Sequence, residues 1–262
     1  MNRLDEDIMR QFFRLDECRT QRLRLQRLWE PESFNWKKRG EPPKQSWSTL
    51  IRLEELAKLG FDKGALEEWR AEEDLAKSTL EKLAEIHALA SSWEPIKGLG
   101  WYLLGCFVAA AGDIGRAPTV SAFWRGMGLD LVDGVPPRNT RGRKGKAQEE
   151  RPRAAMPHVT LVGEQIRTQI VRSINSGNRL SQFYNRFKQE ARVKWPEGPA
   201  MRHHKNGLRL TQKLLYAALW KVWREAYGLE APEPYAFTIL GHTSTPIRIM
   251  HFWEHGPELW QA

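Results

Sequence analysis

Apolar residues recur every three or four positions along most of the chain, which is the spacing of amphipathic helices. The first such segment covers residues 4–29, and Pro31 ends it. The same spacing predicts helices over residues 48–60, 64–92, 161–175, 179–195 and 206–228, and Gly228 ends the last of them. No alternating pattern of useful length indicates a strand. The sequence therefore predicts an all-α fold, a helical bundle.

The predicted helix over residues 64–92 carries an imperfect heptad pattern, which Glu73 and His87 interrupt. Two interpretations fit it: a coiled coil that joins two copies of the chain into a homodimer through residues 64–92, or packing against the chain's own helices. We expect His87 to lie in solvent or at the edge of the seam. The apolar positions near the seam are Leu66, Trp69, Ala76, Leu80, Leu83 and Ala90.

Composition divides the chain into four segments. Residues 1–47 combine the first helix with a linker rich in Pro and Lys, and residues 48–94 are helical with coiled-coil character. Residues 95–228 form a larger helical domain, and residues 229–262 form a C-terminal tail.

The run from Pro95 to Gly115 is apolar in a chain that is otherwise polar, but it is too short and too often broken by glycine to cross a bilayer. We expect it to be buried against protein. Its beginning has the order apolar, any, Gly, apolar, Gly, then helix, which is typical of the hairpin in a helix-hairpin-helix motif. Gly98 and Gly100 permit a tight turn and leave the N–H groups of the next helix open to a phosphate oxygen. Gly98, Leu99 and Gly100 are therefore candidate nucleic-acid-binding residues, with a merely structural turn as the alternative.

The charge of the chain favours an anionic partner. It has 41 Lys and Arg against 32 Asp and Glu, a formal net charge of +9, so a nucleic acid or an anionic membrane surface is the expected partner class. A loop rich in Gly and Pro concentrates this charge, and Arg116 and Arg125 could extend the same face; a solubilising loop is the alternative. The candidate phosphate contacts in the loop are Arg138, Arg141, Arg143, Lys144 and Lys146, followed by Arg151 and Arg153.

The stretch beginning at Gly98 resembles the C-terminal domain of the transposases of insertion-sequence family one-ten, the group guided by a bridge RNA. The matching motifs are Gly98-Leu99-Gly100, Gly112-Asp113-Ile114, Phe123 and Gly128-Leu129. Weaker similarity extends over residues 64–228, and the predicted long helix stands where the family has a coiled coil. The resemblance implies a function in DNA recombination and transposition, with DNA as the partner and RNA as a further one.

Two departures from the family concern catalysis. The resemblance implies a nucleophilic serine after Gly128-Leu129 and carboxylates on an N-terminal RNase H-like domain. This chain has no strand-rich N-terminal domain, and its loop "DLVDGVPPRNTRGRKGK" offers only Thr140. We therefore expect a DNA-binding protein without its own catalytic centre. The alternatives are a divergent recombinase subunit that acts with a separate carboxylate-bearing chain, and a helical protein-interaction module.

Other residues bear on partners and location. Cys18 and Cys106 cannot form a disulfide framework, and the acidic N-terminus is not an export signal, so we expect a cytoplasmic protein without a membrane partner. No cofactor-binding motif is present, and no cofactor is expected. His203 and His204 stand in a basic segment, where phosphate contact is favoured over metal. The tryptophans are expected to be mostly core, with base stacking as the alternative; they include Trp195, Trp220 and Trp223.

Overall fold

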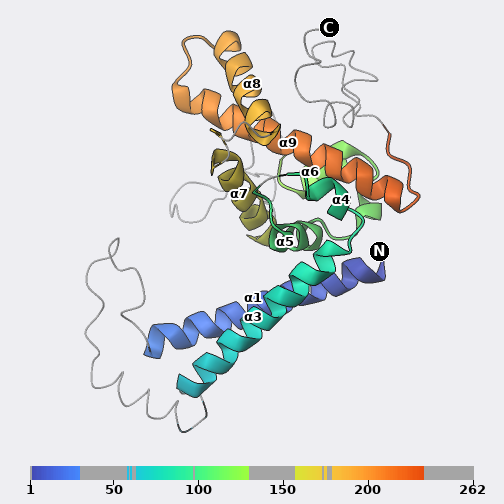
Figure 1. Cartoon of the computed structure of the whole chain (residues 1–262). Coiled ribbons are helices and arrows are strands. Elements are labelled where there is room, and N and C mark those ends of the chain that lie inside the picture. The colour runs from blue at the N-terminus through green and yellow to red at the C-terminus, as the bar shows by residue number, and fades with distance from the viewer. Residues whose placement is uncertain are drawn as a thin grey trace, which may run out of the picture.

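The computed structural model of the chain describes residues 2–29, 58, 60, 63–96, 98–129, 157–172, 174–175 and 179–232. These residues contain α-helices and one 3-10 helix, and no strand, so the prediction of an all-α fold is confirmed (Figure 1). The helices are α1 (Arg3–Trp29), α3 (Lys63–Glu85), α4 (Ala90–Trp93), α5 (Trp101–Ala111), η3 (Ile114–Arg116), α6 (Val120–Gly126), α7 (Pro157–Arg172), α8 (Arg179–Lys194) and α9 (Ala200–Ala226). The predicted helix over residues 48–60, most of its linker, and most of the C-terminal tail lie outside the described residues.

Helices α1 and α3 pack side by side and extend away from the remaining helices (Figure 1). The stripe predicted for the first helix is the buried one, since Ile8, Phe12, Leu15, Cys18 and Leu25 are all buried. On α3 the buried residues are Leu66, Ala76, Leu80 and Ala84. The two helices are antiparallel, because Arg22 of α1 pairs with Glu73 in the middle of α3, whereas Asp5 at the start of α1 pairs with His87 just past the end of α3. The seam of α3 therefore packs on the chain's own α1, while the homodimer stays a prediction.

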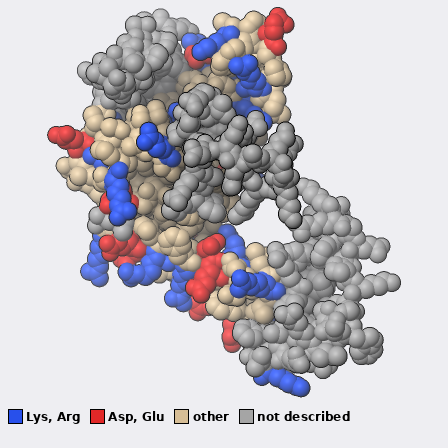
Figure 2. All heavy atoms as spheres, turned by 180° about the vertical axis from the view of Figure 1, so that it is seen from behind, with Lys and Arg blue, Asp and Glu red and all other residues tan. Residues whose placement is uncertain are grey.

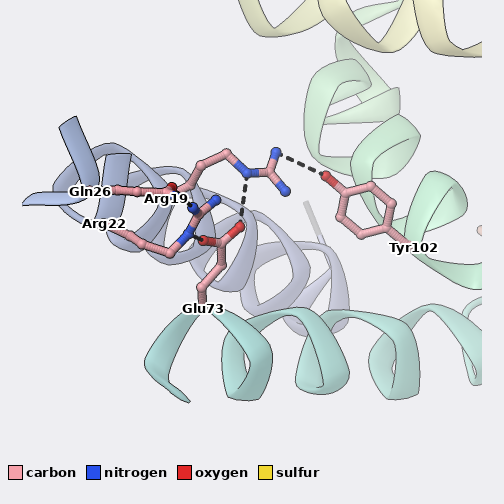
Figure 3. Close-up of polar contacts among 5 residues, drawn as sticks. All are labelled: Arg19, Arg22, Gln26, Glu73 and Tyr102. Carbon is pink, nitrogen blue, oxygen red and sulfur yellow. Dashed lines mark hydrogen bonds and ion pairs between the residues drawn. The ribbon is translucent and has the colours of Figure 1, made fainter. Parts of the chain in front are cut away.

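Glu73, which interrupts the apolar seam of α3, joins three helices (Figure 3). Its carboxylate accepts hydrogen bonds from Arg19 Nε at 3.0 Å and from Arg22 Nε, both on α1. Arg19 also reaches the hydroxyl of Tyr102 on α5, at 3.5 Å, and Arg22 donates to Gln26 at 2.7 Å. Burial opposes ionisation of Glu73, but the hydrogen bonds from Arg22 and Arg19 outweigh it and hold its pKa below the ordinary value.

The long helix was expected to run to Ser92, and this expectation is wrong, because α3 ends at Glu85. The chain turns there so that His87 points inward: its Nε2 lies 3.0 Å from Asp5 Oδ1, and its Nδ1 accepts the N–H of Leu89 at 3.2 Å. His87 is 3% exposed, so its expected place in solvent is also wrong. The buried carboxylate of Asp5 on α1 explains why His87 points inward, and no local pattern in residues 64–92 predicts this.

The same carboxylate also binds the residue that follows α9. Tyr227, which follows α9, donates its hydroxyl to Asp5 Oδ1 at 2.7 Å. We call Asp5, His87 and Tyr227 the N-terminal clasp. Burial, followed by the hydrogen bond to Asp5, raises the pKa of Tyr227 to about 12. The clasp joins α1, the turn after α3 and the end of α9.

The apolar run is buried as expected, because it forms α5 in the centre of the molecule (Figure 1). Gly105 allows α5 to approach α3 closely: a Cβ at this position would lie 2.6 Å from Leu80 Cγ. Trp220 and Trp223 of α9 are buried, which confirms them as core residues. One continuous cluster of buried apolar side chains contains residues from α1 to α9.

Candidate nucleic-acid interface

The glycine pair forms a tight turn between α4 and α5. Gly98 has a φ of +94°, a left-handed conformation that favours glycine. The turn is closed by backbone hydrogen bonds, from the N–H of Ile96 to the carbonyl of Trp93 at 2.9 Å and from the N–H of Leu99 to the carbonyl of Ile96 at 3.2 Å. Residues Gly98, Leu99 and Gly100 are therefore held in one defined conformation.

Leu99 and Trp93 anchor this turn to the core. Leu99 is 6% exposed and Trp93 is fully buried, whereas Gly98 and Gly100 are exposed. The indole N–H of Trp93 donates to the carbonyl of Gly100 at 3.3 Å. Leu99 thus contributes packing to the candidate site, and Gly98 and Gly100 present their backbone at the surface.

Gly100 is the N-cap of α5, with φ −76° and ψ 167°. Its carbonyl accepts the N–H groups of Leu103 and Leu104, at 3.0 and 3.3 Å. No side chain among the described residues caps the helix, so the N–H groups of Trp101 and Tyr102 at its start are available to an external acceptor. The positive end of the helix dipole lies at the same place. The geometry is suited to a phosphate oxygen.

Arg116 and Arg125, which were expected to extend the face of the basic loop, follow α5 in the chain. Arg116 belongs to η3, beyond the C-terminus of α5, and the 11 residues of α5 separate the two ends by about 16 Å. Its side chain is 88% exposed and lies 3.8 Å from Asp113 Oδ2. Arg125 is exposed in the last turn of α6. Neither arginine is part of the turn at Gly98–Gly100.

The basic loop predicted to lie beside this turn is outside the described residues. This applies to Arg138, Arg141, Arg143, Lys144 and Lys146, and also to Thr140, Arg151 and Arg153.

The other motifs that carry the family resemblance have structural positions. Gly112 ends α5 with a φ of +66°, and Asp113 caps η3 by accepting the N–H of Gly115 at 3.0 Å. Ile114 is 1% exposed. Gly128 has a φ of +69°, and its neighbour Leu129 is buried. Each of these residues is explained by a turn, a cap or the core.

The histidine pair expected to contact phosphate lies in the first turns of α9 instead of a loop. His203 is buried, and its Nε2 lies 2.8 Å from the carbonyl oxygen of Trp195. His204 Nδ1 lies 2.7 Å from the hydroxyl of Tyr184 on α8. His203 therefore stabilises the connection between α8 and α9, and the expectation that it contacts phosphate is wrong.

The sequence did not indicate that basic side chains gather where the end of α8 meets the start of α9. Figure 2 shows Lys and Arg side chains with few acidic ones at this end, whereas both signs of charge mix around α1 and α3. Its cations come from α8 and α9, whose periodicity indicates only amphipathic helices. Their common location is visible only after the two helices are paired.

The described residues hold no group of three or more His, Cys, Asp or Glu side chains placed to bind a metal ion. Within the described part of the chain, no helix is long and apolar enough to cross a bilayer. Comparisons with models of protein families, with curated proteins and with solved structures found no match for this chain.

Proposed function

We propose that this chain is a DNA-binding protein that holds the phosphate backbone at the turn Gly98–Gly100. The observation that carries the proposal is the exposed N-terminus of α5, which has no side-chain cap and is presented by two glycines. The net charge of +9 supports a polyanionic partner. Because backbone N–H groups contact phosphate and not bases, this binding is independent of base sequence.

The turn is suited to this role because hydrogen bonds and packing hold its described residues. The buried Leu99, the hydrogen bond from Trp93 to the Gly100 carbonyl, and the left-handed Gly98 hold the N–H groups in place. A preorganised site loses little conformational entropy on binding. In this proposal, α4, the turn and α5 act as a helix-hairpin-helix motif with a first helix of only one turn.

The resemblance to the C-terminal domain of family one-ten transposases supports the same partner. Under this proposal the chain supplies DNA binding to recombination without a catalytic centre of its own. The long helix α3 then contributes dimerisation through the side that α1 leaves open, where Leu75 is 61% exposed, and Ile86, directly after the helix, is 69% exposed.

Gly100→Asp tests the proposal without straining the backbone. The φ of −76° suits any residue, and no atom lies within 4 Å of a Cβ placed at Gly100. Aspartate is also a favoured N-cap, so the variant should fold at least as stably as the wild type. Its carboxylate occupies the N–H groups and repels phosphate, and Gly100→Ala is the matched control because it leaves these donors open.

The measurement is fluorescence anisotropy with labelled duplex DNA and a four-way junction over a range of salt concentrations. We expect a steep salt dependence for the wild type and a loss of affinity of about tenfold or more in Gly100→Asp, as one charge-assisted contact is replaced by repulsion. Gly100→Ala should remain within about threefold of the wild type, since it removes no donor. Equal binding by all three proteins would show that the turn is only structural. No salt-dependent binding by the wild type would overturn the proposed function and favour the protein-interaction module.

A further inference from the structure

The antiparallel pair α8 and α9 carries most of the net positive charge of the chain. Residues 179–209 contain eight Lys and Arg and two Glu, a net charge of +6. The pair crosses closely because Gly207 of α9 has no Cβ, and a Cβ there would lie 3.1 Å from the carbonyl oxygen of Tyr184. The buried face of α8 consists of Leu180, Ser181, Phe183, Tyr184, Phe187 and Ala191. The charged residues therefore remain on the outer surface of the pair.

The connection between the two helices lies at one end of the molecule, away from α1 and α3 (Figure 1). We call Arg192, Lys194, Trp195, Arg202 and Lys205 the α8–α9 basic end. Its four cations are exposed, and none of them forms an ion pair with another described residue. By contrast, Arg186, further back on α8, pairs with Glu190 at 3.0 Å. Four exposed cations at one end of a helix pair are suited to a polyanion.

Trp195 organises two of these cations. The guanidinium carbon of Arg202 lies 4.5 Å from the centroid of the Trp195 ring, and Lys194 Nζ lies 5.2 Å from it. Such cation–π contacts attract both side chains to the ring. They restrict the rotamers of two long side chains, so binding an anion loses less conformational entropy.

The backbone that carries Trp195 is itself held firmly. Its carbonyl oxygen accepts the N–H of Gly198 at 2.9 Å and lies 2.8 Å from His203 Nε2. A Cβ at Gly198 would lie 3.0 Å from both His203 Nε2 and this oxygen. The connection is therefore compact, and it presents Lys194 and Arg202 from a defined position.

We propose that the α8–α9 basic end is a second phosphate-contacting surface for nucleic acid, separate from the turn at Gly98–Gly100. The choice of partner rests on the proposed function. The composition of the surface favours nucleic acid over a membrane, because Val193 and Met201 are the only large apolar side chains described as exposed there. Binding in a membrane interface requires a broad apolar face on the helix. Cations distributed over two helices match the spaced charges of a phosphate backbone.

The double variant Lys194→Gln plus Arg202→Gln tests this surface. Both side chains are exposed, so folding should be preserved, which circular dichroism would verify. The matched control is Lys63→Gln plus Lys82→Gln, which removes the same charge from exposed positions on α3. The measurement is the slope of log binding constant against log salt concentration for a labelled 30-base-pair duplex.

Each phosphate contact contributes about 0.9 to this slope. We expect the α8–α9 double variant to lose a slope of about 1.8 if both cations contact phosphate, with weaker binding at low salt, while the α3 control keeps a slope close to that of the wild type. Equal slopes in both double variants would overturn this inference.

Two further arms separate the possible failures. Gly100→Asp is measured in parallel. If Gly100→Asp loses DNA affinity while the α8–α9 double variant keeps the salt slope of the wild type, only the proposal of a second surface is overturned. If the wild type binds no DNA, the proposed function itself fails. The third arm uses vesicles of phosphatidylcholine with one third phosphatidylserine. If the wild type binds these vesicles and the α8–α9 double variant does not, while the salt slope of the variant for DNA is unchanged, the surface binds membranes and the inference is overturned.

Discussion

The N-terminal clasp should contribute strongly to folding stability, and Asp5→Ala tests this. Asp5 Oδ1 accepts the hydroxyl proton of Tyr227 at 2.7 Å and lies 3.0 Å from His87 Nε2. His87 Nδ1 accepts the N–H of Leu89, so Nε2 carries the ring proton and donates to Asp5. The substitution thus leaves two donors without their acceptor, and His87 is buried.

The magnitude follows from these two donors. A buried donor left without a partner costs about 1–3 kcal/mol, and this cost applies to His87, whereas the hydroxyl of the half-buried Tyr227 can bind water and adds less. An opposing contribution comes from Asp5 Oδ2, which is buried and has no hydrogen-bond partner among the described residues. Removing this poorly solvated oxygen recovers part of the loss. We therefore expect Asp5→Ala to lower the free energy of unfolding by about 1–3 kcal/mol.

The assay is urea denaturation followed by circular dichroism at neutral pH. Asp7→Ala is the matched control, because it removes the same charge from α1 at a half-buried position, where Asp7 makes an ion pair of 3.4 Å with Arg10. This control should change the free energy of unfolding by less than about 1 kcal/mol. The reasoning is refuted if Asp5→Ala destabilises no more than Asp7→Ala does.

Two further predictions concern the contacts that α3 makes with α5 and with α1. In Gly105→Ala, the new Cβ would lie 2.6 Å from Leu80 Cγ, and overpacking of about 1–3 kcal/mol should outweigh the helix-propensity gain of about 1 kcal/mol. A double-mutant cycle in urea checks this, and the same change in a Leu80→Ala background should stabilise, because the cavity accepts the methyl group. The pKa of Glu73 is lowered from its ordinary value of 4.5, so its contribution to stability is present above pH 4.5 and is lost as the pH falls through the lower folded value. Glu73→Gln should lose this part of the acid dependence between pH 6 and 3; parallel curves for the two proteins would contradict the assignment.

Periodicity in the sequence was sufficient to place most helices. The stripe of α1 and the approximate extents of α7, α8 and α9 were predicted, because spacing at three and four is a local property of an amphipathic helix. Gly228 was expected to stop α9, and it has the left-handed φ of +66° that glycine permits. The burial of the run that forms α5 also followed from composition alone.

Periodicity could not predict which polar side chains pair between distant segments of the chain. His87 lies inside the molecule because Asp5, 82 residues earlier, supplies an acceptor there. Glu73 interrupts an apolar seam because Arg19 and Arg22 of α1 face it. A buried polar group is stable only with a partner, and its partner is set by how helices pair and not by local sequence.

The candidate sites divide along the same line. The sequence determined the turn at Gly98–Gly100, because its conformation depends on a left-handed glycine and on neighbours within a few residues. Only the tertiary structure decided that Arg116 lies beyond the opposite end of α5, and that Lys194 and Arg202 gather on Trp195. Periodicity assigns residues to the faces of a helix, but the direction in which each turn sends the next helix depends on contacts between distant segments.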